Sequence, residues 1–173
     1  MTLVAPEGRA LLSPCGGFRY HLERRWADGQ SVAWVMLNPS TADASADDPT
    51  IRKCIGFSTR WGFGHLQVVN LFPLRATDPR DLKLARERFG PMDNDAVIHF
   101  ACLGAALVVL AWGQHGAGYR SRARSVVDLV RAAGTSAVCL GRSKSGEPLH
   151  PLMLGYDTPR EVVDLDREIE RVW

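Results

Sequence analysis

Residues 32–37 read VAWVML and lead directly into the polar residues Asn38-Pro39-Ser40-Thr41. Continuous apolar runs that are rich in β-branched residues are typical of strands buried on both faces of a parallel sheet. Helical patterns separate this run from three others, so we predict an α/β fold, a three-layer sandwich with a central four-stranded parallel sheet. An N-terminal β-hairpin is expected at 10–26, around a Pro-Cys-Gly-Gly turn.

The other three apolar runs also end in polar residues. QVV at 67–69 precedes Asn70, ALVVLA at 106–111 precedes Trp112-Gly113-Gln114-His115, and AVCL at 137–140 precedes a loop that reaches His150. Open sheets of this kind bind ligands beyond the carboxyl ends of their strands. The four polar clusters therefore indicate one shared site.

The chain of 173 residues is expected to form one domain over 1–173, because roughly 100–200 residues is the usual domain size. Within it we expect the hairpin at 10–26, the core at 31–154 and a C-terminal helix at 158–173. That helix would begin at the capping-box pattern Thr158-Pro159-Arg160-Glu161. Helices are also predicted from Pro49 to about Trp61, with Asp48 as N-cap, and from about Asn94 to Leu103.

The charge of the chain is nearly balanced, with 21 basic and 19 acidic residues. Residues 155–173 hold six of the acids and three of the bases, so the other 154 residues carry 18 bases against 13 acids. This local excess of five positive charges is compatible with DNA or a nucleotide as the partner, but it is too small to require one.

The cysteines and the apolar runs indicate the compartment. The four cysteines show no C-x-x-C pair, so we expect buried free thiols in a reducing compartment. The first residues hold no signal-like stretch, and the longest apolar run, 103–112, is shorter than the roughly 20 residues of a membrane span. We therefore expect a cytoplasmic protein with no membrane partner, and a monomer is favoured.

Neither a metal site nor a cofactor site is predicted. None of the five histidines forms a ligand pair at helical spacing. Residues 141–146 have the spacing of a Walker loop, but Glu147 stands where that loop requires lysine. Of the acids that follow the first run, Asp48 is explained as a helix cap. Asp43 has no evident local role and is kept as a catalytic candidate.

Two asparagines at strand ends each allow two interpretations. Asn38 either holds a water or a ligand carbonyl, or it only forms an Asn-Pro turn that ends the strand. Asn70 interrupts an apolar run, where an amide without partners costs roughly 1–3 kcal/mol. It is satisfied either by a neighbouring loop or by the edge of a base, which an amide can read with a donor and an acceptor at once.

Taken in order, the four clusters resemble the motifs of the uracil-DNA glycosylase superfamily, by way of an uncharacterised bacterial and phage domain family that looks like a distant branch of it. MLNPS at 36–40 resembles the Asn-Pro version of its first motif, and VVN at 68–70 resembles the Leu-Leu-Asn end of its second strand. LAWGQHG at 110–116 is similar to Leu-Leu-Trp-Gly-Ser-His-Ala, and HPLML at 150–154 is similar to His-Pro-Ser-Pro-Leu. The resemblance covers residues 31–154 and implies a glycosylase-like core.

The resemblance also implies hydrolysis of a base-sugar bond without a metal or cofactor. Asn38 would orient the attacking water, Asn70 would read the flipped base, and His150 would donate to the departing base. The remaining implied base contacts are Pro39, Ser40 and Phe72. Leu154 would fill the space that the base leaves, and the other implied DNA contacts are Gln114, His115, Arg120 and Lys144.

Three departures from the superfamily pattern affect the expected chemistry. Asn38 replaces the aspartate of the most active branches and cannot act as a base, so slower turnover or help from Asp43 is expected. Ser40 replaces a tyrosine that excludes substituents at the pyrimidine 5-position, so a larger or modified base would fit. Leu152 and Met153 replace Ser-Pro, which leaves the minor-groove clamp unassigned.

Three functions are therefore open at the level of sequence. The first is a DNA N-glycosylase that acts on a damaged or modified base. The second is a nucleic-acid or nucleotide-binding module of the same fold that has lost the chemistry, which salt-sensitive DNA binding without product would favour. The third is a hydrolase of free nucleosides or nucleotides, which activity on monomers would favour.

Overall fold

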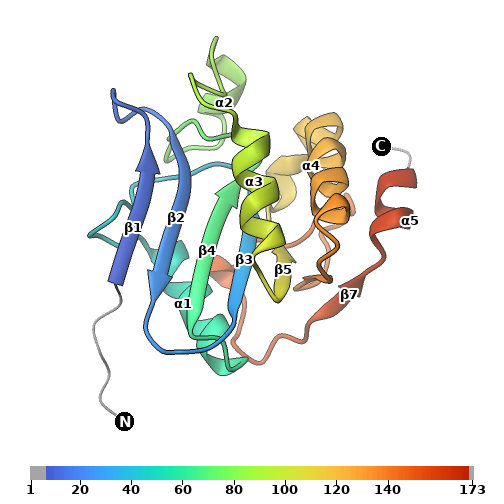
Figure 1. Cartoon of the computed structure of the whole chain (residues 1–173). Helices are drawn as coiled ribbons and strands as arrows, with labels where there is room; N and C mark the ends of the chain where they lie inside the picture. The colour runs from blue at the N-terminus through green and yellow to red at the C-terminus, as the bar shows by residue number, and fades with distance from the viewer. Residues whose placement is uncertain (1–6, 172–173) are drawn as a thin grey trace.

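The computed structural model describes residues 7–171 and has a seven-stranded sheet with helices on both faces (Figure 1). The strand order is β1-β2-β4-β3-β5-β6-β7. The strands are β1 (Glu7–Leu12), β2 (Arg19–Arg25), β3 (Ser31–Met36), β4 (His65–Asn70), β5 (Leu107–Leu110), β6 (Ala137–Cys139) and β7 (Glu161–Val163). The helices are α1 (Pro49–Arg60), α2 (Asp81–Leu84), α3 (Asn94–Leu103), α4 (Arg120–Ala132) and α5 (Leu165–Glu170).

The centre of the sheet is parallel and its edges are antiparallel. β3 pairs in parallel with β4 and β5, and β5 pairs in parallel with β6. The predicted α/β class is therefore confirmed. The sheet is larger than the four strands predicted, because β2 pairs antiparallel with β4 and β7 pairs antiparallel with β6. The N-terminal hairpin, expected at 10–26, consists of β1 and β2 and is part of the sheet.

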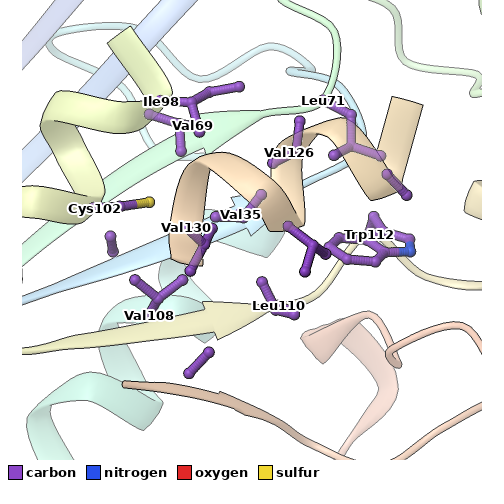
Figure 2. Close-up of a cluster of buried hydrophobic side chains, with 14 of the residues drawn as sticks. Val35, Val69, Leu71, Ile98, Cys102, Val108, Leu110, Trp112, Val126 and Val130 are labelled. Atoms are coloured by element: carbon purple, nitrogen blue, oxygen red, sulfur yellow. The ribbon is translucent and has the colours of Figure 1, made fainter. Parts of the chain in front are cut away.

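The apolar sequence of β3 is explained by burial on both of its faces. All six residues of the strand are buried. On one face Val35 belongs to a cluster with Ile98 of α3 and Val126 of α4 (Figure 2). On the other face Trp34 packs against Phe57 of α1, with ring centroids 6.0 Å apart. The sheet is therefore the middle layer, with α3 and α4 in front of it and α1 behind it in Figure 1.

Two helices begin where the sequence predicts. Asp48 is the N-cap of α1, and its Oδ1 accepts a hydrogen bond from Ile51 N at 2.9 Å. Helix α3 has the predicted bounds, and Asp93 caps it by accepting from Ala96 N. Both starts are local signals, since each cap and its partner are three residues apart.

The C-terminal segment does not form the helix predicted at 158–173. Instead, β7 pairs with β6, and α5 begins only at Leu165, with Asp164 as its N-cap. The prediction is wrong because the outer edge of β6 offers unpaired backbone groups, and pairing with them outweighs the local capping signal at Thr158. Residues 172–173 of that prediction lie outside the described residues.

The helices are short, and the longest of those described, α4, has 13 residues. Within residues 7–171, no helix combines the length and the apolar composition that crossing a membrane requires.

Candidate functional site

A cavity of about 700 Å³ lies at the carboxyl ends of the parallel strands. Its lining includes a polar residue at or beyond the end of each strand: Asn38 after β3, Asn70 at the end of β4, Gln114 after β5 and His150 after β6. The volume is within the range of about 300–1,000 Å³ that is typical of small-molecule sites. The sheet therefore brings polar residues from four distant parts of the sequence to one hollow.

The side-chain amide of Asn38 is held in one orientation. Nδ2 donates to the carbonyl of Ala76 at 2.8 Å and to that of Pro39 at 3.1 Å. Two carbonyl acceptors can be met only by the NH₂ end of an amide, so the position of Oδ1 is also fixed. Among the described residues no donor binds Oδ1. This oxygen can therefore accept a hydrogen bond from a ligand or a water.

Asn70 is buried at the cavity without a structural partner for its side chain. It is 2% exposed, and its Oδ1 is buried with no hydrogen-bond partner among the described residues. The Oδ1 of the neighbouring Asn94 is also buried without a partner among the described residues, but its Nδ2 donates to the carbonyls of Asn70 and Leu71. Of the two interpretations left open by the sequence, the structure gives no support to a bond between the Asn70 amide and a neighbouring loop.

His150 lines the cavity immediately before the 3₁₀ helix Pro151–Met153. Its Nδ1 accepts from Leu152 N at 3.3 Å, so in the neutral ring the proton is on Nε2. Burial lowers the pKa of His150 below its ordinary value and outweighs the opposite effect of Asp48. At neutral pH the ring is therefore an uncharged imidazole with an Nε2–H donor.

Arg19 reaches the cavity because of a β-bulge in the hairpin. The β1–β2 register shifts between Leu11 and Leu12, so Tyr20 is an extra residue on β2. Strict alternation along a strand would put Arg19 and Arg24 on opposite faces. Instead, both donate to backbone carbonyls of the loop that precedes α1. The bulge thus redirects Arg19 towards this loop and the cavity beside it.

Arg19 is a buried cation with few partners. It is 2% exposed, its Nη1 donates to Ala42 O at 2.8 Å, and its Nε is buried without an acceptor. None of the ion pairs between described residues includes it. Burial lowers its pKa to about 10 although Asp48 acts in the opposite direction, so the guanidinium stays charged at neutral pH. Sequence reasoning missed Arg19, since no motif signals the bulge.

The two aspartates before α1 differ from their predicted roles. Asp43 has the local role that the sequence did not reveal: its Oδ1 accepts from the backbone N–H groups of Ser45 and Ala46, and these bonds lower its pKa. It does not line the cavity. Asp48, predicted only as a cap, is buried and is the one carboxylate among the lining residues.

The other predicted base contacts separate into two groups. Ser40 lines the cavity, whereas Pro39 and Phe72 do not. Phe72 is 3% exposed and packs edge-on against Tyr119 in the core, with centroids 4.9 Å apart. The predicted contact between Phe72 and a base is therefore wrong for this conformation, because the ring is enclosed by the layer that contains α3 and α4.

The predicted DNA contacts also separate. Gln114 and His115 are exposed and line the cavity, as does the half-buried Leu154. Leu154 packs against the core on the α1 side, whereas Met153 beside it is 89% exposed. Lys144 is exposed but lies outside the cavity lining, and so does Arg120.

Glu147 explains the position of Arg120. This fully buried carboxylate accepts from Trp112 Nε1 at 2.8 Å and from Arg120 Nε at 3.2 Å. Trp112 follows β5, where Figure 2 shows its ring against the core. Glu147, which stands where a Walker loop requires lysine, thus connects the loop after β6 to the end of β5 and holds one wall of the cavity.

The site combines groups that suit a small polar ligand. Asn38 offers an acceptor, His150 a donor, and Asn70 an unpaired amide, while Arg19 and Asp48 supply one positive and one negative charge. In the described part of the chain, no group of three or more His, Cys, Asp or Glu side chains is arranged to hold a metal ion. The arrangement can bind a heterocycle and stabilise charge of either sign.

Comparison with known proteins identifies the family of the chain. Searches of curated proteins and of solved structures give no match. Residues 19–152 match the family described as "Protein of unknown function (DUF1643)". The match begins at Arg19 and includes Asn38, Asp48, Asn70 and His150, so it covers the polar lining of the cavity. Because it covers well over half of the 173 residues, the chain belongs to the DUF1643 family.

Proposed function

We propose that this protein hydrolyses the bond between a base and its sugar in DNA, as a distant member of the uracil-DNA glycosylase superfamily. The observation that carries the proposal is the convergence of Asn38, Asn70 and His150 on one cavity. These residues are far apart in the sequence, and each has a polar group with no hydrogen-bond partner among the described residues. The strand-end motifs that resemble the superfamily contain the same three residues.

Asn70 would bind the base. A buried amide offers a donor and an acceptor side by side, which complements the polar edge of a heterocycle. Because its Oδ1 has no partner, a bound base would supply a hydrogen bond that the folded protein lacks. The apolar part of the lining, which includes Met36, Ile51 and Leu149, suits the faces of the ring.

His150 would stabilise the departing base. Cleavage leaves negative charge on the base, and a donor aimed at growing charge contributes about 3 kcal/mol. The neutral ring carries this donor on Nε2, since Nδ1 is occupied by Leu152 N. A ring with a lowered pKa keeps this tautomer at neutral pH and does not need to lose a proton before it acts.

Asn38 and Asp48 would act on the water and the sugar. Asn38 Oδ1 accepts a hydrogen bond from the water, whose oxygen bonds to the sugar carbon as the base leaves with the electrons of the broken bond. The water releases one proton to solvent, and the departing base takes up one from solvent. The negative charge of Asp48, rather than that of Asp43, from which the sequence predicted help for Asn38, would stabilise the positive charge on the sugar.

Exposed apolar residues beside the cavity would support base flipping. Met153 and Leu152 line the mouth, and Met153 is the more exposed of the two. Flipping costs a few kcal/mol, which an inserted apolar side chain offsets by replacing the lost stacking. Met153 therefore takes the role that the sequence comparison assigned to Leu154, which packs against the core.

The test is excision from oligonucleotides that contain uracil, hypoxanthine or a 5-substituted pyrimidine, with alkali used to reveal abasic sites. The His150→Ala variant should lose about 10²- to 10³-fold in rate. The control is His21→Ala, because His21 is also half-buried and hydrogen-bonded, to Gln67, but lies outside the cavity. Absence of product on every substrate, or equal rates for His150→Ala and wild type, would refute the proposal.

The size of the cavity favours a second candidate, a hydrolase of free nucleosides or nucleotides. At about 700 Å³ the hollow is large enough for a ligand of more than one ring. Asn38, Asn70 and His150 would act on the same base-sugar bond in a monomeric substrate. Release of free base from monomers, with no product from oligonucleotides, would select this candidate.

A further inference from the structure

The position of Arg19 is not explained by the hydrolysis proposed above. Its guanidinium carries five N–H donors. Among the described residues, the hydrogen bond to Ala42 O occupies one of these donors. Two other arginines contact the same loop and are better satisfied. Arg24 is paired with Asp47, and Arg75 donates to the carbonyls of Ser40 and Thr41.

The surroundings of Arg19 leave its charge without an ion-pair partner among the described residues. Asp48 is the one carboxylate in the lining, and both of its oxygens already accept from backbone N–H groups, of Ile51 and Ala42. Burial lowers the pKa of Arg19, Asp48 raises it, and Arg75 and Arg24 lower it further. Burying a charged side chain without an ion-pair partner destabilises a folded protein. Such a side chain is normally found where a bound group supplies the opposite charge.

We propose that Arg19 binds a terminal anionic oxygen group of the ligand, a carboxylate or a phosphate monoester, inside the cavity. A phosphodiester within a strand is a poor fit, because the strand continues on both sides and would have to enter the cavity with it. Arg19 is 2% exposed, so only a group at the end of a ligand reaches it easily. Carboxylates and phosphates also match the planar fork of a guanidinium.

This inference rests on the proposed function for the location of the heterocycle at Asn70. It adds the substrate class: a heterocycle that itself carries a carboxylate, or a nucleotide with a terminal phosphate. Both ligands would present an anionic oxygen group to Arg19, and they differ in the part of the ligand to which this group is attached. Arg19 would be a specificity-determining residue, and it reaches the ligand because the bulge at Tyr20 redirects it.

The experiment compares two pairs of ligands by calorimetry: uracil with 6-carboxyuracil, and uridine with uridine 5′-monophosphate. We expect one anionic member to bind at least about tenfold more tightly than its neutral partner, as is usual for a hydrogen bond to a charged group. The pair that shows the preference identifies the source of the anion. Arg19→Gln should abolish the preference.

Arg75→Gln is the matched control, because it removes bonds to the same loop from a residue outside the cavity lining. It should keep the preference of the wild type. If Arg19→Gln does not fold, Arg19→Lys replaces it and should show a smaller preference, since lysine lacks the planar fork.

Several results would overturn the inference: no preference in either pair, no binding of either anionic ligand, or a preference that persists in Arg19→Gln or is undiminished in Arg19→Lys. Excision from oligonucleotides together with any of these results would leave the proposed function intact. The preference without excision would support the anion site and refute the hydrolysis of DNA.

Discussion

Replacing Asn70 with leucine should stabilise the protein while it abolishes binding of the base. The side chain is 2% exposed and its Oδ1 has no partner, a situation that costs about 1–3 kcal/mol. Leucine has nearly the shape of asparagine and needs no hydrogen bond. We expect a gain of about 1 kcal/mol in the free energy of unfolding, which raises Tm by about 2–4 °C for a chain of this size.

Asn94→Leu is the matched control for this experiment. Asn94 is also buried and its Oδ1 likewise has no partner among the described residues, but its Nδ2 donates to Asn70 O at 3.1 Å and to Leu71 O at 3.3 Å. Leucine would leave Asn70 O without this donor, whereas Leu71 O keeps the donor Arg122 Nε. This cost of about 1–3 kcal/mol offsets the relief at Oδ1, so we expect a Tm that is unchanged or lower by about 2–4 °C. Of the two substitutions, only Asn70→Leu should therefore raise Tm.

The assay is thermal unfolding followed by circular dichroism, combined with the excision rate on oligonucleotides. Asn70→Leu should show a raised Tm and a rate reduced by at least about 10²-fold, since the amide would be the main polar contact to the base. A lowered Tm would mean that the amide holds the fold together, and the binding interpretation of Asn70 would then be wrong. An unchanged rate would lead to the same conclusion.

Three other predictions follow from the same geometry. Asp48→Asn should keep α1 capped through Oδ1, but its NH₂ group cannot accept from Ala42 N, so Tm should fall by about 2–4 °C while the excision rate falls by about tenfold or more. The pKa of His150 is lower in the folded protein than in the unfolded chain, where it is about 6.5. Between these two pKa values the unfolded chain binds more protons than the folded one. The stability of the fold therefore rises with pH through this window and does not change further above it. Urea unfolding should show that wild type loses stability as the pH falls below about 6.5 and that His150→Ala loses less, whereas equal losses would contradict the buried neutral ring. Glu147→Leu should destabilise the protein by about 2 kcal/mol in the same urea assay, because Trp112 Nε1 loses its acceptor; an unchanged midpoint would show that the indole finds another partner.

Much of the fold could be predicted from neighbouring residues. The run VAWVML at 32–37 predicts a strand buried on both faces, because a strand with one face in water would alternate with polar residues. Asp48 and Pro49 predict the start of α1, since the cap and its partner are three residues apart. The expectation that Asn38, Asn70 and His150 meet follows from parallel strands, whose carboxyl ends lie along one edge.

The remainder of the site depends on pairing between distant segments. A bulge of one residue at Tyr20 turns Arg19 towards the cavity, and the bulge appears only once β1 and β2 pair. Asp43 and Asp48 look alike as sequence, but the path of the loop between β3 and α1 gives the first a surface turn and the second a place in the cavity. Glu161–Val163 becomes a strand because β6 has a free edge, against the helical signal of its own residues. Hydrogen bonds between near neighbours are encoded locally, whereas a side chain's direction across a sheet depends on the register of a partner strand that local sequence does not contain.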